Sequence, residues 1–181
     1  MFENLKDLIR RNANDTIISN PAIPNEKNEV AVEQAGSSIM DTLKNALSGG
    51  RLNEVLGYFK GGAATAPNIV QEATGNYAQD LQNKLGLDPA EAQTVANKVV
   101  PQTMDQLANK TADPSDNSFN IQDIFNQLSG GKTGGLNIQN MLNKFGAGKL
   151  DKDNDGDVDL QDLKSMFAGS GGVMDKVKGV F

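Results

Sequence analysis

The sequence contains no cysteine, no histidine and no tryptophan. The absence of cysteine excludes disulfides, thiolate nucleophiles, iron–sulfur clusters and zinc–thiolate sites. The absence of histidine removes the commonest general base and the commonest transition-metal ligand. No pattern of catalytic side chains stands out elsewhere, so we expect a protein that is not an enzyme. A metal site in this chain would offer oxygen ligands to a hard cation.

Aromatic residues make up only 5% of the 181 residues. The core must therefore consist mainly of Leu, Ile, Val, Ala and Met, which suits closely approaching helices. No run approaches the roughly 18 consecutive apolar residues of a transmembrane helix. These features predict an all-α protein of one or two domains.

Positive charge is scarce and nowhere clustered, and the sequence pI is about 4.6. Nucleic acids and anionic membranes require lysines and arginines grouped on one face, so we expect neither as a partner. The first residues, MFENLKDLIRRNAND, are charged and amphipathic and lack the apolar region and cleavage site of a signal peptide. A cytoplasmic location is the expectation.

One segment, residues 151–162, has a chemically specific sequence. It reads DKDNDGDVDLQD, with six aspartates around one glycine. Calcium loops of the EF-hand type take oxygen ligands from positions 1, 3, 5, 7, 9 and 12, with a glycine at position 6 for the sharp turn. The glycine is Gly156, and the apolar Val158 at position 8 would point into a core. The candidate ligands are Asp151, Asp153, Asp155, Asp157, Asp159 and Asp162.

Charge and side-chain length refine this prediction. Six aspartates and one lysine give the loop a formal charge of −5 out of −6 for the chain. The carboxylates repel one another unless a cation compensates, so the empty loop is expected to be strained. At position 12 Asp162 replaces the usual glutamate, which shortens the reach of the bidentate ligand. We therefore expect one Ca²⁺, bound either more weakly than in tight buffers or with Mg²⁺ as a competitor.

Apolar periodicity predicts helices through the rest of the chain. A short helix covers residues 2–11, and Asn25 is expected to cap a long helix that stops at Gly49-Gly50. Further helices are expected over residues 52–59 and 69–85 and from Asp88-Pro89 onward, with a kink at Pro101. The apolar residues of the long helix that lie on or near one stripe are Val30, Val32, Ala35, Ile39, Leu43 and Leu47.

A weak repeat marks the last third of the chain. FNIQDIFNQL, LNIQNMLNKF and VDLQDLKSMF each place an Asn or Asp that can cap a short amphipathic helix after an apolar residue. The register of the metal loop can also be laid on residues 112–123, where Asp116, Asn120 and Asp123 take positions 5, 9 and 12. Most other ligands are missing there. Either this is a decayed EF-hand paired with the good one through Phe119 and Val158, or it is an ordinary polar loop.

The chain is expected to divide into an N-terminal helical region, 1–110, and an EF-hand-like calcium-binding region, 111–181. NQLSGGKT, residues 126–133, ends like a phosphate-binding loop but lacks its first glycine and follows a helical pattern rather than a strand. We interpret it as a flexible connector between helices. Three methionines near the metal loop, Met141, Met166 and Met174, are expected to pack in the core rather than to line a calcium-opened groove.

At NPAIPNEKNEVAVEQAGSSIM and LGLDPAEAQTVANKVVPQTMDQL the chain resembles the YidB-like family of small bacterial proteins of unknown function. The resemblance covers about residues 1–148. It implies a glycine-punctuated helical protein of bacterial origin and brings no catalytic residue.

The metal loop resembles EF-hand loops, and DNDGDVDLQDL is also similar to the calcium segment of dockerins, which carry two such segments where this chain has one. The sequence thus predicts an all-α helical bundle with a C-terminal EF-hand-like helix–loop–helix unit. The expected function is non-enzymatic calcium binding that stabilises the fold. The alternative is a calcium-dependent interaction or assembly protein, acting by self-association or by dockerin-like binding of a protein partner.

Overall fold

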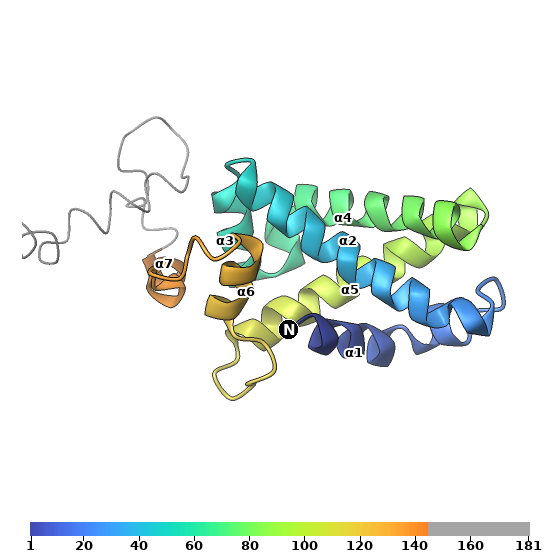
Figure 1. Ribbon diagram of the computed structural model, residues 1–181, viewed down its shortest axis with the longest axis horizontal. Coiled ribbons are helices and arrows are strands. Elements are labelled where there is room, and N and C mark those ends of the chain that lie inside the picture. Colours follow the sequence, from blue (N-terminus) through green and yellow to red (C-terminus); the bar gives the residue numbers. More distant parts are fainter. Residues whose placement is uncertain (145–181) are drawn as a thin grey trace, which may run out of the picture.

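Helices make up all the regular secondary structure of residues 1–144, the part of the chain that this computed structural model describes (Figure 1). The all-α prediction is therefore confirmed for this part. The α-helices are α1 (Phe2–Asn12), α2 (Asn28–Ser48), α3 (Leu52–Gly61), α4 (Pro67–Asp80), α5 (Pro89–Ala112), α6 (Ile121–Leu128) and α7 (Ile138–Lys144).

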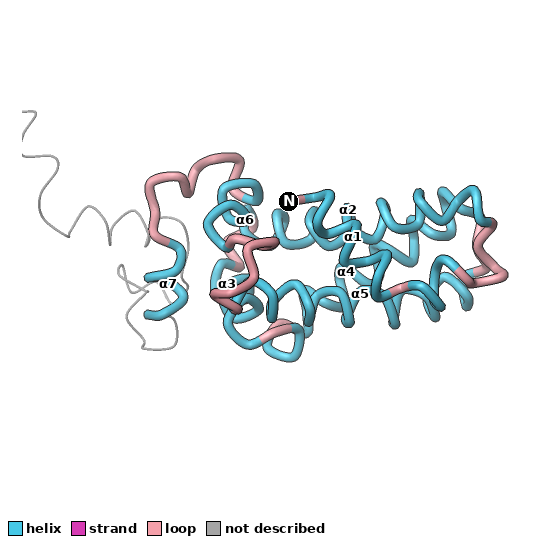
Figure 2. The backbone as a smooth tube through the Cα atoms, turned by 90° about the horizontal axis from the view of Figure 1, so that it is seen from below, coloured by secondary structure: helices cyan, strands magenta, loops and turns pink. Residues whose placement is uncertain are grey.

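The long helices lie side by side as a bundle. α4 and α5 form an antiparallel hairpin, α2 packs along α4, and α1 contacts both α2 and α5. The three short helices α3, α6 and α7 gather at one end of the bundle, where α7 contacts both α6 and α3 (Figure 2). α7, the last described helix before the predicted metal loop, therefore lies at this end.

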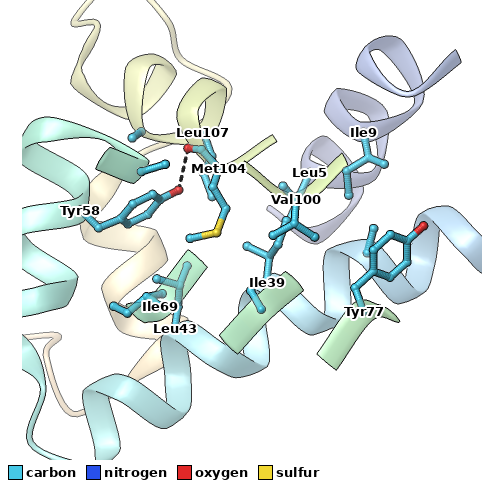
Figure 3. Close-up of a cluster of buried hydrophobic side chains, with 14 of the residues drawn as sticks. Leu5, Ile9, Ile39, Leu43, Tyr58, Ile69, Tyr77, Val100, Met104 and Leu107 are labelled. Carbon is cyan, nitrogen blue, oxygen red and sulfur yellow. Dashed lines mark hydrogen bonds between the residues drawn. The ribbon is translucent and has the colours of Figure 1, made fainter. Parts of the chain in front are cut away.

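The core is built as the composition predicts, from aliphatic residues and alanines with a few aromatic rings. α1 and α2 approach so closely that a Cβ on Gly36 would lie 3.1 Å from the Phe2 ring. The hydroxyl of the fully buried Tyr58 donates a hydrogen bond to the Met104 carbonyl at 2.8 Å (Figure 3). Burial, together with the nearby Asp105 carboxylate, raises the pKa of Tyr58. This hydrogen bond satisfies the buried hydroxyl and links α3 to α5.

Residues on both sides of position 110 contribute to one hydrophobic cluster. Phe125 of α6 is fully buried, and its ring centroid lies 5.6 Å from that of Phe59 of α3. Met141 of α7 is also buried, as expected for this methionine. The division into regions 1–110 and 111–181 stays a prediction.

The start of α5 agrees with the prediction, whereas the start of α2 does not. The Asp88 side chain accepts a hydrogen bond from the Ala90 amide at 2.9 Å, with Pro89 in the first position of α5. Asn25 does not cap α2. Residues Asn25–Lys27 form a 3₁₀ turn, closed by the Lys27 amide on the Pro24 carbonyl at 2.8 Å, and α2 follows directly. Backbone bonding has replaced the expected side-chain cap.

Val30 is the other correction in α2. Its exposed fraction is 38%, whereas the other residues of the predicted stripe are buried. The buried residues from Val32 onward recur at spacings of three and four, and Val30 lies two residues before Val32, away from their face. The apolar stripe therefore begins at the first turn with Ala31 and Val32.

Gly62, which ends α3, has a conformation that favours glycine. Its φ is +78° and ψ is −172°, and a Cβ there would lie 3.2 Å from Oδ1 of Asp105. That same oxygen accepts the Ala63 amide at 2.9 Å, so it has little freedom to move. We expect Gly62→Ala to lower the free energy of unfolding by about 1–3 kcal/mol, measured by urea denaturation.

The matched control is Gly75→Ala in the middle of α4, where a Cβ meets nothing within 4 Å. This substitution is expected to raise the free energy of unfolding by about 0.5–1 kcal/mol, because alanine favours a helix interior. Equal effects of the two substitutions would contradict the role assigned to the Gly62 backbone.

Candidate functional site

The six predicted metal ligands, Asp151, Asp153, Asp155, Asp157, Asp159 and Asp162, lie outside the described residues. The last described element before them is α7. The Asn137 side chain accepts the Asn140 amide at 2.9 Å and so caps α7, as the repeat predicts. The segment LNIQNMLNKF thus begins a helix at the cap that the repeat predicts.

The second candidate loop, residues 112–123, lies between two helices. α5 ends at Ala112, which is position 1 of the predicted register, and α6 begins at Ile121, which is position 10. The Asn120 side-chain oxygen accepts the amides of Gln122 and Asp123 at 2.9 and 3.3 Å. Residue 120 therefore caps α6, which confirms the second cap predicted from the repeat. The overall arrangement is helix–loop–helix.

The two aspartates in the first half of this loop accept hydrogen bonds from protein donors. Oδ1 of Asp113 accepts the amide and hydroxyl of Ser115 at 2.8 and 2.6 Å. Oδ1 of Asp116 accepts the amide of Ser118 at 2.8 Å and also its hydroxyl. Oδ2 of Asp116 lies 2.7 Å from the ammonium of Lys110. These bonds turn the carboxylates toward their own loop and toward α5.

No group of three or more acidic side chains within residues 1–144 is placed to hold a metal ion together. In the predicted register of residues 112–123, Ala112 and Pro114 occupy positions 1 and 3 and bring no side-chain oxygen. A pocket of about 180 Å³ lies between this loop and Gln139 of α7. Its lining includes Asp113 and Asp116, whose hydrogen bonds are those just described.

The loop is fixed to the bundle from two sides. Phe119, at position 8 of the predicted register, is only 3% exposed and belongs to the hydrophobic core. The Asn4 side chain of α1 donates to the Ser118 carbonyl at 2.7 Å. A residue of α1 thereby contacts a loop more than a hundred positions away, which the sequence alone did not indicate.

Hydrogen bonding lowers the pKa of both loop aspartates. The Lys110 ammonium and the Ser118 donors hold the pKa of Asp116 well below its usual range, and Ser115 lowers that of Asp113. A carboxylate with a depressed pKa in the folded state stabilises the fold above its unfolded-state pKa of about 4. This stabilisation is lost as the pH falls through the folded-state value.

We therefore expect Asp116→Asn to weaken the dependence of stability on pH below about pH 4, because the asparagine side chain does not titrate there. The measurement is urea denaturation at a series of pH values between neutral and strongly acid. The control is Asp41→Asn, at an exposed position of α2. An unchanged pH profile in Asp116→Asn would contradict the assignment.

The first three residues of NQLSGGKT complete α6, which ends at Leu128, and the rest of the segment leads on toward α7, as predicted for a connector. It is held by its own hydrogen bonds. The fully buried Thr133 donates its hydroxyl to the Asn126 side chain at 3.0 Å, and its amide donates to the Ser129 hydroxyl at 3.2 Å. Gly130 and Gly131 have φ of +63° and +86°, so the chain can reverse here.

The regular structure of residues 1–144 is helical throughout, so the described part of the chain is an all-α helical bundle. Among residues 1–144 no helix is both long and apolar enough to cross a membrane. The chain belongs to a family described as "Bacterial protein of unknown function (DUF937)", which matches residues 67–177. No curated protein and no solved structure matches the chain. The family range extends from α4 through residues 151–162.

Proposed function

We propose that this protein is a non-enzymatic calcium-binding protein that holds one Ca²⁺ in residues 151–162. The observation that carries the proposal is the placement of six aspartates at positions 1, 3, 5, 7, 9 and 12 of one loop, with Gly156 at position 6. Asp157 would contribute its backbone carbonyl and Asp162 the closing carboxylate. Since Asp162 is shorter than glutamate, Mg²⁺ is the expected competitor.

The proposed role of the ion is to stabilise the fold. A bound Ca²⁺ neutralises part of the −5 charge of the loop and lets the last part of the chain dock onto the bundle. α7, which precedes this loop, supports such docking. Its residues Ile138 and Met141 are buried, so the helix is anchored on the bundle.

Pairing of the two loops is part of the same proposal. In that arrangement residues 112–123 are a decayed EF-hand, and Phe119 and Val158 face each other at position 8. The helix–loop–helix form of α5 and α6 and the burial of Phe119 support it. We also propose that the bacterial family is related to the YidB-like family, on the resemblance of residues 20–40 and 85–107.

Titration with Ca²⁺ in the presence of a hydrophobic dye tests the structural role. We expect a rise in melting temperature without a rise in dye fluorescence. A calcium-dependent gain in dye binding would favour the alternative, in which the ion exposes a groove for a partner. Sedimentation with calcium and with chelator tests the assembly alternative, which predicts calcium-dependent self-association.

A further inference from the structure

Lys110, in the last turn of α5, places its positively charged side chain beside the loop that follows this helix. Its ammonium lies 2.7 Å from Oδ2 of Asp116, and the exposed fractions of the two side chains are 36% and 20%. A positive charge near a helix C-terminus also interacts favourably with the helix dipole. Lys110 was not singled out from the sequence, because a lysine near an aspartate is common in any polar loop.

We propose that the Lys110 ammonium takes the place of a metal ion in loop 113–120. Its pairing with Asp116 holds the loop between α5 and α6 in its observed conformation. The proposal goes beyond calcium binding at residues 151–162 and does not depend on it.

Hydrogen bonds carry the effect of Lys110 from α5 through the loop to α1. Asp116 accepts from Lys110 with one carboxylate oxygen and from the Ser118 amide with the other. The Ser118 carbonyl in turn accepts from Asn4 of α1 at 2.7 Å. The next residue along the chain, Phe119, enters the core, and Asn120 then caps α6. Lys110 thus helps to set where α6 begins.

The same loop offers few free oxygen ligands to a metal ion. Ca²⁺ takes about six to eight oxygen ligands, and here the Asn120 oxygen is directed to the α6 amides while Asp113 is directed to Ser115. An ion at Asp116 would also have to displace the Lys110 ammonium. An ion bound in the pocket of about 180 Å³ beside the loop would overturn the proposal.

The test measures thermal unfolding of the full chain in excess chelator, so that its result does not depend on whether residues 151–162 bind calcium. We expect Lys110→Met to lower the melting temperature by about 2 °C, and Lys110→Arg, which keeps the charge, to restore most of the loss. The matched control Lys98→Met, at an exposed position of the same helix, is expected to leave it unchanged.

A double-mutant cycle with Asp116→Asn separates the ion pair from a general effect of the lysine stem. We expect Lys110→Met to have no further effect once Asp116 is replaced. The proposal would be overturned if Lys110→Met lowered the melting temperature equally with and without Asp116. It would also be overturned if Lys110→Met and Lys98→Met lowered it equally. Calcium binding that persists in Asp151→Ala and disappears on adding Asp116→Asn would overturn it as well, because loop 113–120 would then hold a metal itself.

Discussion

Phe125→Ala is expected to lower the free energy of unfolding by about 3–5 kcal/mol, because a fully buried aromatic ring is replaced by a cavity. The ring belongs to α6 and packs against Phe59 of α3, so its loss affects both sides of residue 110. Urea denaturation followed by circular dichroism measures the effect. The exposed Val30 provides the control, and Val30→Ala is expected to change stability by less than about 0.5 kcal/mol.

The shape of the unfolding transition adds a second result from the same experiment. If the residues around Phe125 and those of α1–α5 share one core, the wild type and Phe125→Ala each unfold in a single transition with similar slopes. Two separate transitions, with only one of them shifted by Phe125→Ala, would show instead that regions 1–110 and 111–181 unfold independently.

Calcium is expected to produce the second large effect. At a free concentration of 100 times the dissociation constant, one bound ion adds about 2.7 kcal/mol to the free energy of unfolding. Asp151→Ala and Asp162→Ala remove proposed ligands and are expected to abolish this gain. Thermal or urea unfolding with calcium and with chelator measures it. The matched control is Gln161→Ala, at position 11 of the same loop, which offers no ligand in the proposed register.

The sign of the stability difference between each aspartate variant and the wild type distinguishes an ion site from a loop of general structural importance. In chelator each aspartate variant relieves charge repulsion and is expected to be at least as stable as the wild type. In calcium the order reverses, because the wild type alone gains from binding. A variant that is less stable than the wild type by the same amount in both conditions would contradict ion binding by that aspartate.

Helix boundaries that depend on local chemistry could be predicted from the sequence. Asp88 followed by Pro89 starts α5, and the repeated Asn120 and Asn137 cap α6 and α7. Asn25 failed as a cap because a backbone 3₁₀ turn satisfied the start of α2 first. Capping residues show where a helix is able to begin, whereas the preceding backbone decides whether the cap is used.

Contacts between distant segments could not be predicted in this way. The Asn4 side chain reaches Ser118 only because α1 packs beside the end of α5, and nothing local to either residue indicates it. The same is true of Phe125 against Phe59. The candidate calcium ligands differ, because all of them fall within twelve consecutive residues and spacing alone identifies them. Their affinity depends on where Asp162 sits relative to the other ligands, which spacing does not give.

The most direct measurement is a calorimetric titration of chelator-treated protein with Ca²⁺, repeated in the presence of Mg²⁺. We expect one site per chain, weakened when Mg²⁺ competes and abolished by both Asp151→Ala and Asp162→Ala. A titration without heat, together with an unchanged melting temperature in calcium, would contradict the account and leave residues 151–162 as an acidic turn.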